Sequence, residues 1–231
     1  MPHYHVSLLP GDGIGPEITS VTKAVLEAVS KKNNFELSFN ELLIGGQSIE
    51  QNGSPLPKET LEQCLKSDAV LLAAIGSPQY DTLPRALRPE TGLLELRSGM
   101  NLFANLRPIK VYDSLIESSS LKEAVIKGVD LLVVRELTGG IYFGEPKGRV
   151  NTENDERAFN TMTYSASEIE RISQIAFNLS LQRKRKLCSV DKANVLDVSQ
   201  LWREKVSLIS DNYPEIEFTN LYVDNAAMQL I

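Results

Sequence analysis

The feature that most constrains the fold is an apolar run at residues 69–75, AVLLAAI, which ends at Gly76-Ser77-Pro78. The run is apolar on both faces and far shorter than the ~20 residues of a membrane helix, so it predicts a central strand of a parallel sheet. Residues 5–9 form a second apolar strand, followed by a glycine turn. A helix then begins at Pro16-Glu17, because proline and an acidic residue suit a first helical turn. This order predicts an α/β fold.

Composition narrows the class of protein. The chain has 231 residues, enough for one large domain or two small ones, and a net charge of −6. The negative charge argues against nucleic acid or an anionic membrane as the main partner. Two distant cysteines, Cys64 and Cys188, lack metal-ligand spacing and indicate reduced thiols. The first residues lack a signal-peptide pattern, so we predict a cytoplasmic protein.

Hydrophobic spacing predicts the remaining elements. Strands are expected at residues 35–42, 102–108, 129–136, 187–190 and 218–223, and helices at 58–66, 90–100, 165–183 and 197–210. Ser165 and Glu168 fit a capping box, and Asp197 is expected to cap its helix. Residues 141–144 are predicted as a strand edge and residues 147–160 as a solvated loop or arm. We place a domain boundary after residue 102.

The glycine turn at residues 11–15, GDGIG, allows two interpretations. Its pattern is G-x-G-x-G-P rather than the G-x-G-x-x-G of dinucleotide-binding turns, which favours a plain tight turn over a pyrophosphate site. Ligands of open α/β sheets gather at the carboxyl ends of strands. The loop that begins at Gly76 therefore either faces an active cleft or simply ends a strand.

Residues 89–108, PETGLLELRSGMNLFANLRP, hold the strongest candidate site. They contain Glu90, Arg97 and Arg107 but no lysine. Arginine offers a planar fork of donors that binds a carboxylate through two bonds. Helical spacing places Leu93 beside Arg97, so the segment suits a small acid with a hydrocarbon side chain. Surface ion pairing is the alternative for both arginines, and for Arg135 as well.

Four further residues lie where chemistry is expected. Arg135 lies near the end of the predicted strand 129–136, Lys192 lies at a strand end, Tyr142 follows a glycine pair, and Asp224 opens the last helical segment. Lys192 could act as a base, Tyr142 as an acid, and Asp224 as a ligand of a hard divalent ion. The residues alone also fit a surface lysine, a strand aromatic and a helix cap, and one carboxylate does not make a metal site.

Five sequence blocks in one order carry a family resemblance. The blocks are LLPGDGIGPE (8–17), LLELR with LFANLRP (93–108), VRELTGGIYFGEP (134–146), SVDKANVL (189–196) and YVDNAAMQL (222–230). The chain resembles the 3-isopropylmalate dehydrogenases, within the family of β-decarboxylating dehydrogenases, over essentially its whole length. The resemblance implies a two-domain isopropylmalate/isocitrate dehydrogenase-like α/β fold with a mixed, mostly parallel sheet, not a Rossmann fold. Residues 1–102 would belong to the outer, cofactor-side domain and residues 103–231 to the central substrate and dimerisation domain.

The same resemblance implies an activity. It is the NAD-dependent oxidative decarboxylation of 3-isopropylmalate to 4-methyl-2-oxopentanoate in leucine biosynthesis, with Mg²⁺ or Mn²⁺. Isocitrate-specific relatives carry polar residues where this chain has GLLELR, which favours an alkyl malate. A dehydrogenase of homoisocitrate, tartrate or isocitrate, and a non-catalytic dimerising remnant, are the alternatives.

The resemblance also implies roles for single residues in a homodimer whose subunits share each active site. Lys192 would be the base and Asp224 a ligand of both substrate and metal, each lent by the partner subunit, and Tyr142 would be the acid. The remaining roles are carboxylate binding by Arg97, Arg107 and Arg135, contact with the isopropyl group by Leu93, and cofactor binding by Ile14, Gly76 and Glu90.

Two segments of the family are not found in these residues. Family members continue with a stretch resembling NxFGDILSD, which carries two metal-binding aspartates, and later with GSAPDIAGKG, which binds adenosine and contains the acid that selects NAD over NADP. We therefore expect the chain to correspond to the N-terminal two-thirds of the family's chains, with its first domain incomplete. We expect it to be inactive or very weak by itself.

Overall fold

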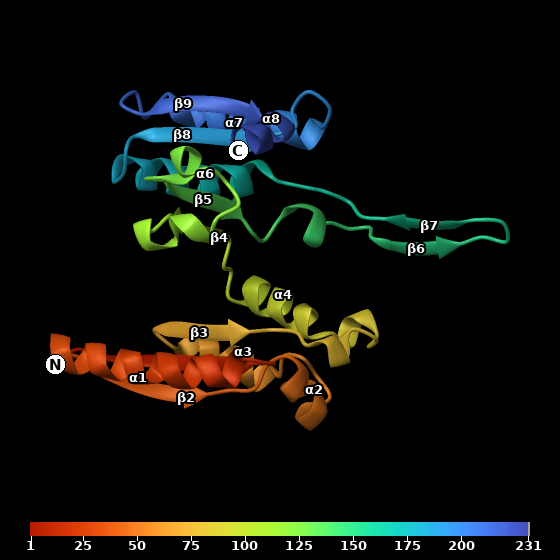
Figure 1. The fold of residues 1–231 in the computed structure, drawn as a ribbon. Helices are drawn as coiled ribbons and strands as arrows, with labels where there is room; N and C mark the ends of the chain where they lie inside the picture. The colour runs from red at the N-terminus through yellow and green to blue at the C-terminus, as the bar shows by residue number, and fades with distance from the viewer. Residues whose placement is uncertain (231) are drawn as a thin grey trace. The chain divides into compact units, whose positions relative to one another are not determined.

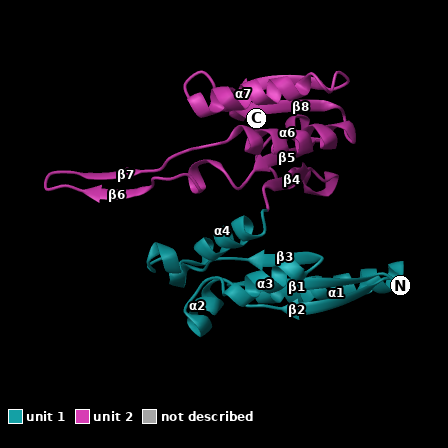
Figure 2. Cartoon of the chain, turned by 180° about the vertical axis from the view of Figure 1, so that it is seen from behind, with its two compact units in different colours: residues 1–101 teal, residues 102–231 magenta. Residues whose placement is uncertain are grey.

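The computed structural model describes residues 1–230 and divides the chain into two compact units, residues 1–101 and 102–231 (Figures 1 and 2). Each unit has its own hydrophobic core, so each is described by itself. The functional roles that we predicted for the two domains remain predictions.

Unit 1 alternates strands and helices, as the apolar spacing predicts. Its elements are β1 (His3–Gly11), α1 (Gly15–Asn33), β2 (Glu36–Glu41), α2 (Gly46–Asn52), α3 (Lys58–Lys66), β3 (Ala69–Ala74), the 3₁₀ turns η1 (Pro78–Tyr80) and η2 (Arg85–Leu87), and α4 (Pro89–Gly99). Pro16 lies in the first turn of α1, as expected.

The sheet of unit 1 is parallel, but its central strand is β1 and not β3. Within the described residues the strand order is β2-β1-β3, with Val6 opposite both Phe39 and Ala69. The buried half of β1 packs Leu9 into a core with Ile44 and other apolar side chains. Our placement of residues 69–75 at the centre was therefore wrong, because a continuous apolar run does not reveal which strand gains neighbours on both edges.

Helix α1 carries an apolar stripe on an exposed face. Ile18, Val21, Val25 and Val29 recur at helical spacing, and each is exposed by 41% or more. The buried residues of α1 are Gly15, Thr19 and Ser30. Helical periodicity thus predicted the helix correctly, whereas the residues of α1 that are fully buried are small.

Unit 2 begins with a strand, interleaves strands with helices and ends in a helix. Its elements are β4 (Ala104–Lys110), η3 (Asp113–Ser118), α5 (Glu123–Ile126), β5 (Asp130–Glu136), η4 (Gly140–Tyr142), β6 (Gly148–Asn151), β7 (Glu156–Phe159), α6 (Ala166–Leu181), β8 (Lys186–Asp191), α7 (Asp197–Ser210), β9 (Glu217–Tyr222) and α8 (Val223–Gln229). Strands β4 and β5 pair antiparallel, and β8 and β9 pair parallel.

Helices α6 and α7 build the core of unit 2. Ile169 and Phe177 of α6 are fully buried and meet Val206 of α7. The predicted capping box at the start of α6 is confirmed, since the Ser165 side chain accepts from Glu168 N and the Glu168 side chain accepts from Ser165 N. Asp197 does not cap α7 but is its first residue, and the preceding residue makes no side-chain cap.

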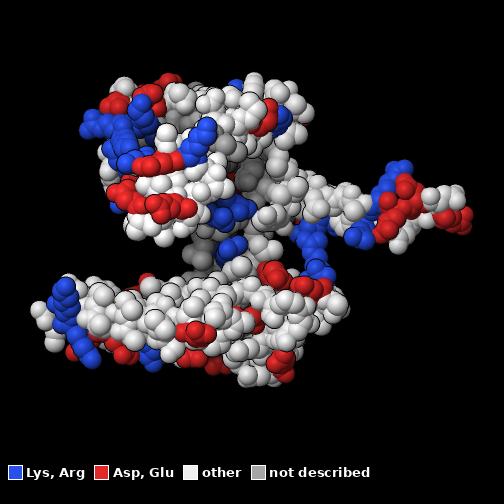
Figure 3. Space-filling model, in the orientation of Figure 1, with Lys and Arg blue, Asp and Glu red and all other residues white. Residues whose placement is uncertain are grey.

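One loop prediction is wrong, and the predicted arm at residues 147–160 is confirmed as a largely exposed hairpin. Residues 141–144 lie in and after a 3₁₀ turn rather than on a strand edge, because Gly140 adopts a φ of +76° and turns the chain. Residues 148–159 form the β6–β7 hairpin, which projects from the rest of unit 2 (Figure 1). It carries both acidic and basic side chains (Figure 3), and some of them pair, as in Arg149–Glu156 at 3.1 Å.

Apolar helices of membrane-spanning length are not found among residues 1–230.

Candidate functional site

One face of the β4–β5 ladder presents two of the predicted substrate arginines. Asn105 lies opposite Arg135, and Arg107 is two residues from Asn105, so the three side chains share a face. Arg107 Nε donates a hydrogen bond of 2.7 Å to Asn105 Oδ1. The ladder therefore places Arg107 and Arg135 within reach of one small anion.

The predicted acid Tyr142 lies beside Arg135. The Arg135 guanidinium stacks over the Tyr142 ring, with 5.3 Å between its carbon and the ring centroid. The Tyr142 side chain is exposed, and its backbone carbonyl accepts a 3.4 Å hydrogen bond from Lys147 Nζ. The structure thus brings together a guanidinium and a phenol from opposite sides of a glycine turn.

Glu136, which sequence reasoning missed, anchors that turn. Its side chain is 1% exposed and accepts from Thr138 N at 3.0 Å and Gly139 N at 2.7 Å. Its other oxygen accepts from Thr138 Oγ1 at 3.0 Å and Arg171 at 2.8 Å. Neighbouring residues of a strand point to opposite faces, so Glu136 is buried while Arg135 faces the site. The sequence signal was the pair Arg-Glu at a strand end followed by Leu-Thr-Gly-Gly.

The structure also joins the predicted base to the predicted metal ligand. Lys192 Nζ lies 2.5 Å from Asp224 Oδ1, with the two side chains 33% and 65% exposed. Lys192 follows β8 and Asp224 is the second residue of α8, so parallel pairing of β8 and β9 brings both to one edge. The hydrogen bond from Lys192 lowers the pKa of Asp224 below its usual value.

Directly before Lys192 lies a second buried carboxylate that sequence reasoning missed. The Asp191 side chain is 2% exposed and accepts two 2.9 Å hydrogen bonds from Arg203 of α7. It also accepts from Ala193 N at 2.9 Å, which bends the chain immediately around Lys192. The hydrogen bonds to Asp191 raise the pKa of Arg203.

In unit 1 the predicted cofactor residues lie at the carboxyl edge of the sheet. Gly76 follows β3 with a φ of +96°, and Glu90 covers it so closely that a Cβ on Gly76 would stand 2.6 Å from Glu90 Oε1. Ile14 is the residue before α1 and is 56% exposed. All three residues belong to loops or helix starts at the edge where ligands of α/β sheets bind.

A third missed carboxylate, Asp12, holds these loops together. It is 2% exposed, and its oxygens accept from Gly46 N at 2.7 Å, Gln47 N at 3.2 Å and Gly76 N at 2.9 Å. Its own N–H donates to Ala74 O at 2.9 Å. Asp12 thus fixes the end of β3 and the start of α2 around the glycine turn, which explains an acid within GDGIG.

Helix α4 has a buried packing face and, next to it, a face that carries predicted site residues, here called the site face. Pro89, Gly92 and Leu96 are buried at i, i+3 and i+7. One residue further on, and therefore on the adjacent face, lie Glu90, Leu93 and Arg97. Leu93 and Arg97 are half-buried, as expected for an apolar wall beside a cation. Arg97 belongs to unit 1 and Arg107 to unit 2, so the proposed clamp of both remains a prediction.

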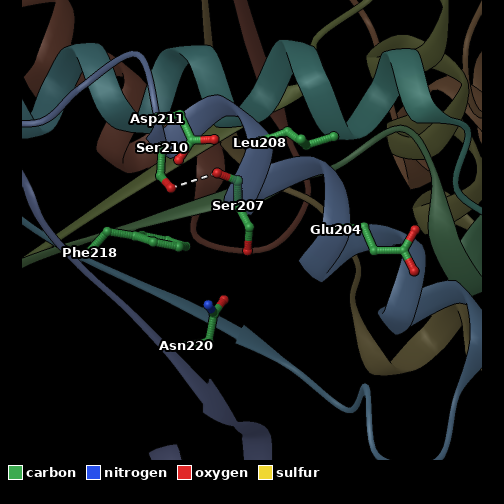
Figure 4. Close-up of a pocket in the computed structure, with 7 residues that line it drawn as sticks. All are labelled: Glu204, Ser207, Leu208, Ser210, Asp211, Phe218 and Asn220. Carbon is green, nitrogen blue, oxygen red and sulfur yellow. Dashed lines mark hydrogen bonds between the residues drawn. The ribbon is translucent and has the colours of Figure 1, made fainter.

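Depressions in the surface of unit 2 lie away from these residues. One of about 560 Å³ between α7 and β9 is lined by Glu204, Ser207, Leu208, Ser210, Asp211, Phe218 and Asn220 (Figure 4). Another of about 610 Å³ is largely apolar and is lined by β5, α6, β8 and α8. Neither contains a predicted site residue, so the chemistry is argued from the side-chain clusters.

Within residues 1–230, no group of three His, Cys, Asp or Glu side chains is placed to hold a metal ion. Asp224 is one carboxylate, and it is engaged by Lys192. The described residues therefore do not by themselves form a site for Mg²⁺ or Mn²⁺, each of which takes several oxygen ligands.

Comparison with known proteins places this geometry in a family. The profile of the isocitrate/isopropylmalate dehydrogenase family matches residues 5–231. The chain is 63% identical over 231 residues to a 3-isopropylmalate dehydrogenase of Synechococcus sp. strain CC9605 and 59% identical to that of Wolinella succinogenes. It spans all of its own length in both alignments but only 65% and 63% of the length of these relatives.

Solved structures agree. The isocitrate dehydrogenase of Methylococcus capsulatus aligns with a TM-score of 0.81 at 28% identity, covering 98% of this chain and 62% of that one. A β-decarboxylating dehydrogenase of Thermococcus kodakarensis aligns with a TM-score of 0.71 at 29% identity, covering 98% and 60%. The chain belongs to the isocitrate/isopropylmalate dehydrogenase family.

Proposed function

We propose that the chain serves the NAD-dependent oxidative decarboxylation of 3-isopropylmalate to 4-methyl-2-oxopentanoate, a step of leucine biosynthesis. The observation that carries the proposal is 63% identity along the whole chain to a 3-isopropylmalate dehydrogenase, against 28% to a structure of an isocitrate dehydrogenase. The half-buried Leu93 on the site face of α4 supports an alkyl substituent rather than a third carboxylate.

Carboxylate binding falls to the arginines. Arg107 and Arg135 share a face of the β4–β5 ladder and suit the carboxylates of a malate, because guanidinium groups bind carboxylates through paired hydrogen bonds. Arg97, on the same face of α4 as Leu93, is proposed to bind carboxylate next to the substrate's alkyl group.

Two proton transfers fall to Lys192 and Tyr142. As the neutral amine, Lys192 takes the proton of the substrate hydroxyl while the carbinol carbon gives up hydride. It therefore has to leave its ion pair with Asp224. The carbon–carbon bond to the carboxylate then breaks and CO₂ leaves. The electron pair of that bond stays on the substrate, which becomes an enolate. Tyr142 then donates a proton to the enolate carbon, with Arg135 over its ring.

The carboxyl edge of the unit 1 sheet is proposed to bind a nicotinamide dinucleotide. Exposed Ile14 offers an apolar surface to adenosine, and a Cβ on the adjacent Gly13 would meet nothing within 4 Å. Gly76 and Glu90 are proposed to lie along the nicotinamide end. NAD, when bound, supplies the hydride acceptor. For Mg²⁺ or Mn²⁺ the described residues supply Asp224 as one candidate ligand, and we derive no step through the metal.

We also propose a cytoplasmic homodimer in which Lys192 and Asp224 serve the site of the partner subunit. In the described residues, contacts join Arg135 with Tyr142 and Lys192 with Asp224, and no hydrogen bond joins one pair to the other. In versions extended to the length of the relatives, mixing a Lys192→Met chain with a Tyr142→Phe chain should restore activity that each lacks alone. A mixture of Lys192→Met and Asp224→Asn should stay inactive.

The test of the function is reduction of NAD by the purified chain with 3-isopropylmalate and Mn²⁺, beside a version extended to the length of its relatives. Isocitrate, homoisocitrate and tartrate are the comparison substrates. We expect 3-isopropylmalate to be preferred, with turnover in the extended version and little or none in the chain of 231 residues. Preference for another malate would refute the proposed substrate. Absence of NAD reduction by both versions with all four acids would refute the proposed activity.

A further inference from the structure

The segments that carry Lys192 and Asp224 leave the sheet at the same point. Asp191 and Tyr222 are the last register partners of β8 and β9. Lys192 follows Asp191 directly, and Asp224 is two residues beyond Tyr222. The distance of 2.5 Å between the Lys192 ammonium and the Asp224 carboxylate therefore depends on how firmly this last register pair is held.

Arg203 of α7 holds both members of that pair. Its Nε and terminal nitrogen each donate a 2.9 Å hydrogen bond to the Asp191 carboxylate. The same guanidinium lies over the Tyr222 ring, with 4.7 Å from its carbon to the ring centroid. One planar cation thus binds β8 by hydrogen bonds at its edge and β9 by its face, two contacts that the ammonium of lysine does not make together.

We propose that Arg203 is a positioning residue that sets the Lys192–Asp224 pair, which deepens the proposed function and rests on it. Arg203 does not itself contact Lys192 or Asp224 in the described hydrogen bonds and ion pairs. It acts through Asp191, whose side chain is buried, and through Tyr222. The strand ends then present the amine and the carboxylate at a fixed separation.

The test measures the Lys192 amine directly. Native chain is labelled briefly with an amine-acylating reagent at fixed pH, and modification of each lysine is quantified by mass spectrometry. In the wild type, the ion pair with Asp224 protects Lys192. Arg203→Met should raise its labelling severalfold, and Arg203→Lys should do so too, because charge alone does not restore the fork and the stacking.

Two controls separate positioning from general loosening. Lys205→Met removes an equally exposed cation (30% for each side chain) from the same helix, where it pairs with Glu170 at 3.0 Å. Lys186 pairs with Glu217 at 2.8 Å at the opposite end of β8 and β9, so its labelling reports the far end of the same strands. Lys192 labelling should stay close to the wild-type level in Lys205→Met. Lys186 labelling should stay close to the wild-type level in the Arg203 variants.

If Arg203→Met does not fold, Asp191→Asn/Arg203→Gln leaves a neutral hydrogen-bonded pair and is labelled instead. Unchanged Lys192 labelling in folded variants, or an equal rise at Lys186, would overturn the proposal. Where turnover is measurable, kcat should fall by about 10- to 100-fold with a smaller change in KM, as expected for misplacement of a reacting group. Labelling does not require turnover, so failure of the proposed activity leaves the positioning result readable.

Discussion

The anchor of the turn between Arg135 and Tyr142 gives the sharpest test of the structure. In Glu136→Gln the side chain keeps its shape but loses its charge and one acceptor oxygen. The carboxylate accepts from two backbone N–H groups, one hydroxyl and one guanidinium, whereas the amide offers one oxygen and places an NH₂ group toward the other donors.

The expected loss of stability is large for one isosteric change. Glu136 is 1% exposed, so water cannot replace the lost partners, whereas Arg171 is 31% exposed and recovers part of its hydration. Breaking a buried ion pair from one side costs about 3–5 kcal/mol, and the partial exposure of Arg171 places this case near the lower limit, about 3 kcal/mol. With a urea m-value of about 2 kcal/mol/M, the midpoint should fall by about 1.5 M.

The assay is urea unfolding followed by tryptophan fluorescence. The chain has one tryptophan, Trp202, which packs against the core of unit 2, so its signal reports the unit that contains Glu136. Glu156→Gln is the matched control, since Glu156 also pairs with an arginine of unit 2 but lies 59% exposed on the hairpin. The control should change stability by less than about 1 kcal/mol. Equal midpoints for the two variants would refute the anchoring role of Glu136.

Three further outcomes are expected. Asp12→Asn should destabilise unit 1 by about 2–3 kcal/mol, because a buried charged acceptor of three backbone N–H groups becomes an amide. Urea unfolding checks this, with the exposed acceptor variant Asp68→Asn as a control that should change little. Burial raises the pKa of Tyr164 above its usual value of 10.0. The stabilising contribution of its neutral phenol is therefore complete below pH 10 and is lost as pH rises through the raised pKa. Tyr164→Phe should reduce the fall of the unfolding free energy at alkaline pH, and an unchanged dependence of that free energy on pH would contradict this. A thiol reagent should modify exposed Cys188 in the native chain but Cys64 only on unfolding. The reason is that Cys64 is 0% exposed and burial raises the pKa of its thiol. Equal modification rates of the two cysteines in the native chain would contradict the burial of Cys64 in the core of unit 1.

Helices and strands were largely predictable, because their signals are local. The predicted helix at residues 58–66 matches α3, and the capping box at Ser165 is present. The spacing of Leu93 and Arg97 also predicted their shared face on α4. Strand order was not predictable in the same way, since β1 and β3 are both apolar and only pairing with distant residues makes β1 central.

The three buried carboxylates show where sequence reasoning stopped. In the sequence nothing distinguishes these three acids, Asp12, Glu136 and Asp191, from ordinary surface acids. Each is buried because folding brings it partners from other parts of the chain. Asp12 binds the backbone of residues 34 and 64 positions away, and Glu136 binds an arginine 35 positions away. Their shared position next to predicted site residues is visible only in the folded chain.

The sequence by itself determined the family, the α/β class, the helical and strand segments and the candidate residues, because periodicity, glycine turns and motif order are properties of neighbouring residues. Only the tertiary structure decided that Arg135 stacks on Tyr142, that Lys192 pairs with Asp224, and that a buried acid supports each cluster. The physical reason is that burial of a charge requires partners, and those partners come from segments that the chain brings together only by folding.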